Sequence, residues 1–151
     1  MTTARVTVTV VLGLALRATP GAVADQEKQI TALAPQDIQW FTPAYYTDGR
    51  QRAHLRGDST KGGEWIDRVR IPAASRILPH THPQEEVVTI VEGTWYVGVG
   101  EKFDETKLRA YPAGSFIVIP ENVPHFLATK KDPAIVQVSG HGIFQTNYVE
   151  R

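Results

Sequence analysis

The sequence contains no cysteine, so the chain can form no disulfide and offers no thiolate as a nucleophile or metal ligand. It also has no excess of charge of either sign, because 16 Lys and Arg balance 16 Asp and Glu. This balance argues against nucleic acid, an anionic membrane or a polyacidic substrate as the partner. A small molecule is therefore the expected partner, and histidine and carboxylate side chains are the expected ligands of any metal ion.

The N-terminus has the pattern of a secretory signal peptide rather than of a folded element. Arg5 supplies a positive start, residues 6–16 are almost wholly apolar, and Ala22-Val23-Ala24 forms a small-residue cleavage site before Asp25. The apolar run is too short for a membrane span of about 20 residues. The pattern predicts a signal peptide over residues 1–24, a periplasmic or secreted protein, and no membrane association after processing.

The remaining residues have the length of one domain. Residues 26–39 are expected to form a short helix, within an N-terminal extension of residues 25–64 that also holds the first strands. Residues 65–151 then form the main barrel. Short β-rich runs bounded by turn residues indicate an all-β sandwich or barrel. The expected strands are residues 65–71, 86–91, 94–99, 115–119, 125–129, 135–139 and 144–149.

Glu92-Gly93 lies between two of these apolar runs. A glycine reaches positive φ without steric cost and suits a tight hairpin. We therefore expect residues 87–91 and 94–99 to pair with each other.

One group of residues has the spacing and chemistry of a metal site. His80 and His82 are two residues apart, and side chains at i and i+2 of an extended strand point to the same side. Glu86 follows in the same parity after a bend, and His125 follows a proline-rich turn at the start of a later strand. Three imidazoles and one carboxylate leave two positions open on an octahedral ion. Such a set suits iron, manganese, zinc, nickel or cobalt better than calcium or magnesium.

Two segments resemble the motifs of the cupin superfamily. The sequence HTHPQEEVVTIVEG at residues 80–93 is similar to the first motif, and GSFIVIPENVPH at residues 114–125 is similar to the second. The resemblance covers about residues 65–139. It implies a small single-domain cupin, built as a double-stranded β-helix or jelly-roll barrel, with His80, His82, Glu86 and His125 as ligands of one divalent transition metal ion. It also implies pairing into a homodimer.

Three positions depart from the motifs without removing a ligand. Ala74 and Asn122 stand where the motifs often have glycine, and Thr129 stands where asparagine can follow. Asn122 is a mild change because asparagine tolerates the left-handed conformation. Thr129 affects only the hydrogen bonding expected of its strand.

The other candidate residues are weaker. His54 and His141 lack a partner at ligand spacing, so a loop or hydrogen-bonding role is favoured for both. Glu85 is expected to face away from Glu86. Alternation from Gly93 and His125 places three further side chains toward the cavity, namely Trp95, Leu127 and Gln137.

The resemblance leaves the reaction open, because cupins with this ligand set include oxalate-degrading enzymes, dioxygenases and sugar isomerases. No arginine cluster accompanies the motifs, which favours a small, apolar, oxygen-bearing ligand over oxalate or a phosphosugar. We expect a metal-dependent enzyme of the dioxygenase or oxidase type. The alternatives are a non-catalytic cupin that binds a metal or small ligand for sensing or storage, and a barrel whose metal only stabilises the fold.

Overall fold

The computed structural model describes residues 30–149, so the predicted signal peptide 1–24 lies outside the described residues. From Ala32 onward the described residues belong to one compact unit. In residues 30–149 no helix has the length and apolar character that a membrane span needs.

Helix is confined in the described part to two 3-10 turns, Pro35–Asp37 (η1) and Glu105–Lys107 (η2). The expected helix over residues 26–39 is thus limited to η1 where the structure describes it. Pro35 explains this limit, because a proline pushes the residue before it out of the helical region, and Ala34 is extended at φ −74° and ψ 160°.

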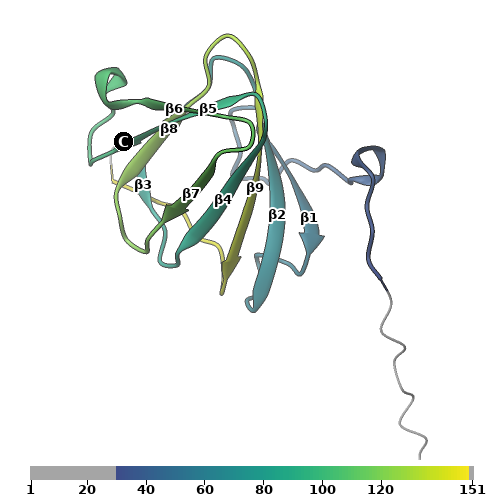
Figure 1. Cartoon of the computed structure of the whole chain (residues 1–151). Helices are drawn as coiled ribbons and strands as arrows, with labels where there is room; N and C mark the ends of the chain where they lie inside the picture. The colour runs from purple at the N-terminus through teal and green to yellow at the C-terminus, as the bar shows by residue number, and fades with distance from the viewer. Residues whose placement is uncertain (1–29, 150–151) are drawn as a thin grey trace, which may run out of the picture. The chain divides into compact units, whose positions relative to one another are not determined.

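The fold is all β, as the sequence predicts, and consists of two antiparallel five-stranded sheets (Figure 1). The first sheet has the order β1-β2-β9-β4-β7 and the second the order β10-β3-β8-β5-β6. The strands are Gln51–Arg56 (β1), Glu64–Ile71 (β2), Arg76–Thr81 (β3), Glu86–Glu92 (β4), Thr94–Val99 (β5), Arg109–Pro112 (β6), Phe116–Ile119 (β7), His125–Ala128 (β8), Ala134–His141 (β9) and Asn147–Tyr148 (β10).

Of these strands, only β6 has no counterpart in the prediction. Strand β1 lies in the extension 25–64, where the first strands were expected, and β3 contains His80 of the extended segment expected to hold His80 and His82. Strand β3 contains Pro79, although proline is usually absent from the interior of a sheet. Here it lies where the register between β3 and β8 shifts, between Ile77 and His80. The irregularity accommodates the missing N–H group, so β3 can pair on both sides.

The predicted hairpin at Glu92-Gly93 is wrong. Strand β4 pairs with β7 and β9, whereas β5 pairs with β6 and β8 in the other sheet. Gly93 does take a positive φ of 74°. The backbone turns there from one sheet to the other, and a Cβ at this position would lie 2.1 Å from the carbonyl oxygen of Pro133.

The core lies between the sheets and is built from alternate residues of both. Trp65 and Ile71 of β2, Val88 and Ile90 of β4, and Val136 of β9 are each at most 1% exposed. Side chains at odd and even positions of a strand point to opposite faces. One face of each sheet is therefore apolar and covered by the other sheet.

Candidate metal centre

Three histidines meet inside the barrel. His80 of β3 is directly opposite His125 of β8 in the antiparallel register, and His82 follows β3 by one residue. The ring centroids lie 4.3 Å apart for His80 and His125, and 4.9 Å apart for His80 and His82. One ligand nitrogen from each of the three histidines lies within 4.8 Å of the other two. The structure thus brings together the three histidines that the sequence singled out.

Each histidine is oriented by a backbone carbonyl at its Nδ1 atom. The distances are 2.6 Å from His80 to the oxygen of Leu78, 2.7 Å from His82 to that of Gln145, and 2.9 Å from His125 to that of Val123. A carbonyl oxygen only accepts, so Nδ1 carries the proton in every case. The lone pair of a neutral ring is then on Nε2, the tautomer that metal-binding histidines commonly show.

Burial keeps these rings neutral at physiological pH. It lowers the pKa of His80 to about 3 and that of His82 to about 4, and it lowers the pKa of His125 in the same direction. Proximity of the rings to one another adds to the effect for His80 and His82. Neutral imidazole is the form that donates a lone pair to a metal ion.

Glu86 enters from the other sheet as the first residue of β4, and it is 5% exposed. Its Oε2 atom lies 3.4 Å from Nε2 of His82. Burial raises the pKa of Glu86 to about 7, although the charge of Arg52 opposes the shift. Glu86 is not a member of the compact three-histidine group, so the set of four ligands stays a prediction for this residue.

Two observations indicate that the residues present can hold a metal ion. Nε2 of His125 is buried and has no hydrogen-bond partner among the described residues. Nε2 of His82 and Oε2 of Glu86 are both acceptors when the carboxyl group is ionised, and they face each other at 3.4 Å. Two ligands at a right angle on an ion with bonds of about 2.1 Å lie about 3 Å apart. A shared cation would resolve both features.

Beside the histidines lies a cavity of about 40 Å³ between the sheets. Trp95 and Leu127 line it, as predicted, but Gln137 does not. Val136 and Val138 are the residues of β9 that point inward, so Gln137 between them points to the other face of the sheet. There Oε1 of Gln137 accepts a hydrogen bond from Nε of Arg68 at 3.4 Å. The walls of the cavity combine aliphatic, aromatic and polar side chains.

Sequence reasoning missed the polar residues that complete the cavity, which are Tyr46, Arg50, Arg52 and Thr146. All four lie outside the two motifs. The one signal for them was the i, i+2 spacing of Arg50 and Arg52, which puts two arginines on the same side of an extended segment.

Arg52 belongs to a buried polar network on β1 and β2. Its NH1 atom lies 3.4 Å from Oδ2 of Asp67 and donates to Oγ of Ser59 at 3.1 Å. Nδ1 of His54 lies 2.7 Å from Oδ1 of Asp67. His54 therefore has the hydrogen-bonding role that the sequence favoured for it.

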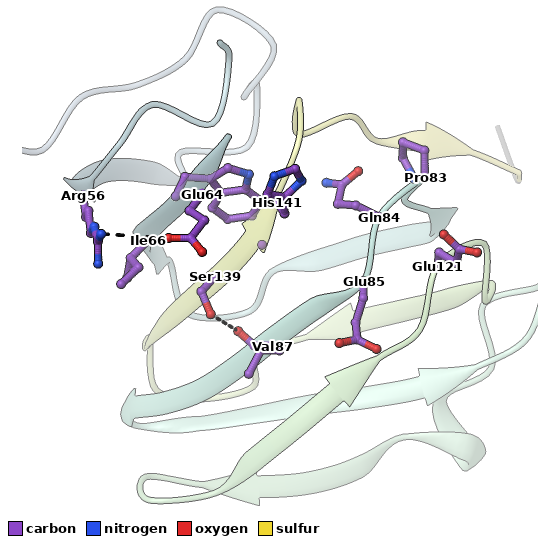
Figure 2. A pocket seen from close by; sticks show the side chains of 12 residues that line it. Arg56, Glu64, Ile66, Pro83, Gln84, Glu85, Val87, Glu121, Ser139 and His141 are labelled. Atoms are coloured by element: carbon purple, nitrogen blue, oxygen red, sulfur yellow. Dashed lines mark hydrogen bonds and ion pairs between the residues drawn. The ribbon is translucent and has the colours of Figure 1, made fainter. Parts of the chain in front are cut away.

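A second hollow, of about 650 Å³, is on the outer face of the first sheet (Figure 2). Glu85 lines it and so faces away from Glu86, as alternation predicts. His141 and the carboxylates of Glu64 and Glu121 also border it. Within residues 30–149 they form no group of potential metal ligands comparable to the three histidines.

The three positions that depart from the motifs have definite structural roles. The backbone conformation at two of them is one that glycine adopts more easily. Ala74 and Asn122 both have left-handed φ angles, of 56° and 59°. The amide of Asn122 donates to the carbonyl of His82 at 2.8 Å, which ties the turn before β8 to the metal centre. Thr129 accepts from the amide of Ser75 at 3.0 Å and donates to the carbonyl of Pro72, so it holds the end of β8.

Comparisons with known proteins agree with this architecture. The family model described as a cupin domain matches residues 67–139. No curated protein matches the chain. Among solved structures, the polyketide cyclase RemF from Streptomyces resistomycificus aligns with a TM-score of 0.67 and 15% identity, over 82% of this chain and 87% of its own.

Two further structures show the same fold. An RmlC-like cupin from Ralstonia eutropha JMP134 has a TM-score of 0.59 and 20% identity, covering 76% of this chain and 70% of its own. The DMSP lyase DddQ from Ruegeria pomeroyi DSS-3 has a TM-score of 0.55 and 22% identity, covering 70% of this chain and 56% of its own. At these identities the likeness establishes the jelly-roll fold and nothing about the reaction.

Proposed function

The chain carries a small domain of the cupin superfamily, and on this premise we propose that it is a metal-dependent enzyme of the dioxygenase or oxidase type that acts on a small oxygen-bearing molecule. One observation carries the proposal. The three histidines donate Nδ1–H to backbone carbonyls and keep the Nε2 lone pairs for a common cation.

In this proposal His80, His82 and His125 hold one divalent ion of iron, manganese, zinc, nickel or cobalt, and Glu86 is the fourth ligand. Such an ion supplies Lewis acidity toward an oxygen atom of the substrate. The chain itself orients the imidazoles, provides a negative charge through Glu86, and lines the cavity with aliphatic and aromatic side chains beside the polar ones. The charge of Arg52 favours the ionised form of Glu86.

Elemental analysis of the purified protein and of three variants tests the metal centre. Wild type is expected to hold about one equivalent of a transition metal, and His80→Ala and His125→Ala are expected to lose it. His141→Ala is the matched control, since His141 is exposed and lies on the outer face. Full metal content and unchanged thermal stability with chelator in both site variants would show that the ion does not bind here.

Oxygen uptake with a panel of diketones, catechols and hydroxy acids then tests the reaction. Oxygen consumption that depends on the metal and is lost in His125→Ala supports the oxidative enzyme. A metal-loaded protein that binds panel compounds without turnover favours the non-catalytic binding cupin. The observation that favours this second function is the small volume of the cavity, about 40 Å³.

We also propose that the protein is exported and that it pairs into a homodimer. The export proposal depends on the pattern of residues 1–24, and N-terminal sequencing of the exported protein should begin at Asp25. The dimer is consistent with the outer edge strand β7, where Phe116 is 63% exposed. Light scattering of the purified protein measures the mass directly.

A further inference from the structure

Two hydrogen-bond donors inside the barrel have no acceptor from the described part of the protein. Nε1 of Trp95 and Nε of Arg52 are both buried and unpartnered. The residues are 3% and 2% exposed, and both line the cavity beside the histidines. An N–H of tryptophan or arginine can only donate, so a partner in the cavity must bring acceptors.

The two donors come from opposite walls. Arg52 lies on β1 in the first sheet, and Trp95 lies on β5 in the second. Because buried polar groups are costly when unpaired, a molecule with at least two acceptor atoms is the complement of this cavity.

The charges around the cavity indicate the net charge of the ligand. Arg52 is paired with Asp67 at 3.4 Å, and Arg50 is paired with Asp48 at 2.7 Å, so each pair is neutral. Ionised Glu86 beside a divalent ion leaves one positive charge. Unbalanced charge is expensive away from water, so a single negative charge on the ligand completes the balance.

The residues at the opening of the cavity indicate the shape and polarity of the rest of the ligand. A second cavity of about 260 Å³ adjoins the first and shares Tyr46, Arg50, Phe144 and Thr146 with it. Tyr45 and Tyr148 also line this outer part. Aromatic side chains around an opening favour a flat apolar group, which they contact with their faces or edges.

We infer that the site binds a small monoanion, a carboxylate or enolate on a flat apolar body. Its oxygen atoms accept from Trp95 Nε1–H and Arg52 Nε–H, and its body lies among the aromatic residues of the mouth. The inference rests on the proposed metal centre and extends it, because it names the charge of the substrate and two residues that select it.

The experiment is calorimetric titration of the zinc-loaded protein with benzoate and benzamide, and with acetate and acetamide. Zinc is not redox active, so binding is measured without turnover. Within each pair the anion and the neutral amide have nearly the same shape. Zinc content is measured on the same samples.

Two variants each remove one donor and preserve the fold. Trp95→Phe keeps an aromatic ring, and Arg52→Lys keeps the charge beside Asp67. Each is expected to weaken anion binding about tenfold, as the loss of a charge-assisted hydrogen bond would. Arg70→Lys is the matched control and should bind as wild type does, because Arg70 is exposed and lies over Trp40.

The inference holds if the anion binds at least about tenfold more tightly than its amide in either pair, and if both donor variants lose that preference. It is overturned if zinc is bound at one equivalent and the anions show no preference, or if Trp95→Phe and Arg52→Lys bind as wild type does. In those cases the proposed metal centre can still be correct, but the inferred selection of a monoanion is wrong. If no zinc is bound, the metal centre is wrong and the inference fails with it.

Discussion

Acidification of the metal-free protein should reveal two opposed contributions to stability from the residues of the candidate metal centre. His80 and His82 have pKa values of about 3 and about 4, below the ordinary 6.5 of histidine. Between pH 4 and pH 6.5 the unfolded chain binds protons at these two histidines and the folded protein does not. The stabilising contribution of the two histidines is therefore complete above pH 6.5 and is lost as the pH falls. Glu86 has its pKa raised from 4.5 to about 7. Its contribution is complete below pH 4.5 and is lost as the pH rises through 7.

These shifts give the expected size of the effect. Between pH 7 and pH 5 each histidine should lower the free energy of unfolding by about 2 kcal/mol, and Glu86 should raise it by about 2 kcal/mol. The wild-type protein then loses about 2 kcal/mol. In Glu86→Gln the offset is absent, and the loss becomes about 4 kcal/mol. The lowered pKa of His125 adds to the loss in both proteins.

The assay is urea unfolding in the presence of a chelator at pH 5, 6 and 7, for wild type, Glu86→Gln and His141→Gln. His141 is exposed, so its variant should follow the wild-type curve. The reasoning is refuted if Glu86→Gln and wild type depend on pH identically, or if wild type becomes more stable on going from pH 7 to pH 5. Either outcome would mean that these groups are not buried as the structure has them.

Three further predictions concern the turns and the strand end that hold the site. Ala74→Gly should raise the free energy of unfolding by about 0.5–1 kcal/mol, whereas Asn122→Ala should lower it by about 1 kcal/mol, because both positions are left-handed; urea midpoints measure both. Gly93→Ala should cost about 3 kcal/mol, since its Cβ would meet the carbonyl of Pro133, and a thermal midpoint equal to that of wild type would contradict this. Thr129→Val should cost about 1–2 kcal/mol, because the amide of Ser75 loses its acceptor while the carbonyl of Pro72 keeps the hydroxyl of Ser75 as a donor. Thr129→Ser, which keeps the hydroxyl, should recover part of the loss in the same thermal scan.

Local patterns in the sequence were enough to predict the three-histidine cluster. The i, i+2 spacing of His80 and His82 puts both rings on one side of a strand, and the motif resemblance identifies His125. Alternation predicted the opposite orientations of Glu85 and Glu86 for the same reason. Each of these properties depends on a few neighbouring residues, so it can be read without knowing the fold.

Pairing between strands was decided by the tertiary structure. The sequence predicted that β4 and β5 pair, because a glycine with a positive φ serves a hairpin and a sheet-to-sheet corner equally well. The neighbours of β3, and the register shift beside its Pro79, also appear only in the pairing with β8 and β10. In both cases the deciding contacts involve residues far away in the chain.

The chemical character of the cavity was also decided by the tertiary structure. Arg52 is brought to the candidate metal centre because β1 pairs with β2, and its charge is tolerated there because Oδ2 of Asp67 lies 3.4 Å from its NH1 atom. Trp95 reaches the same cavity from the other sheet. The sequence by itself determined which three histidines form the candidate metal centre, whereas the packing of two sheets determined which charges and donors face it. The reason is physical: the spacing of His80 and His82 is a property of one strand, but a cavity is bounded by segments that only folding brings together.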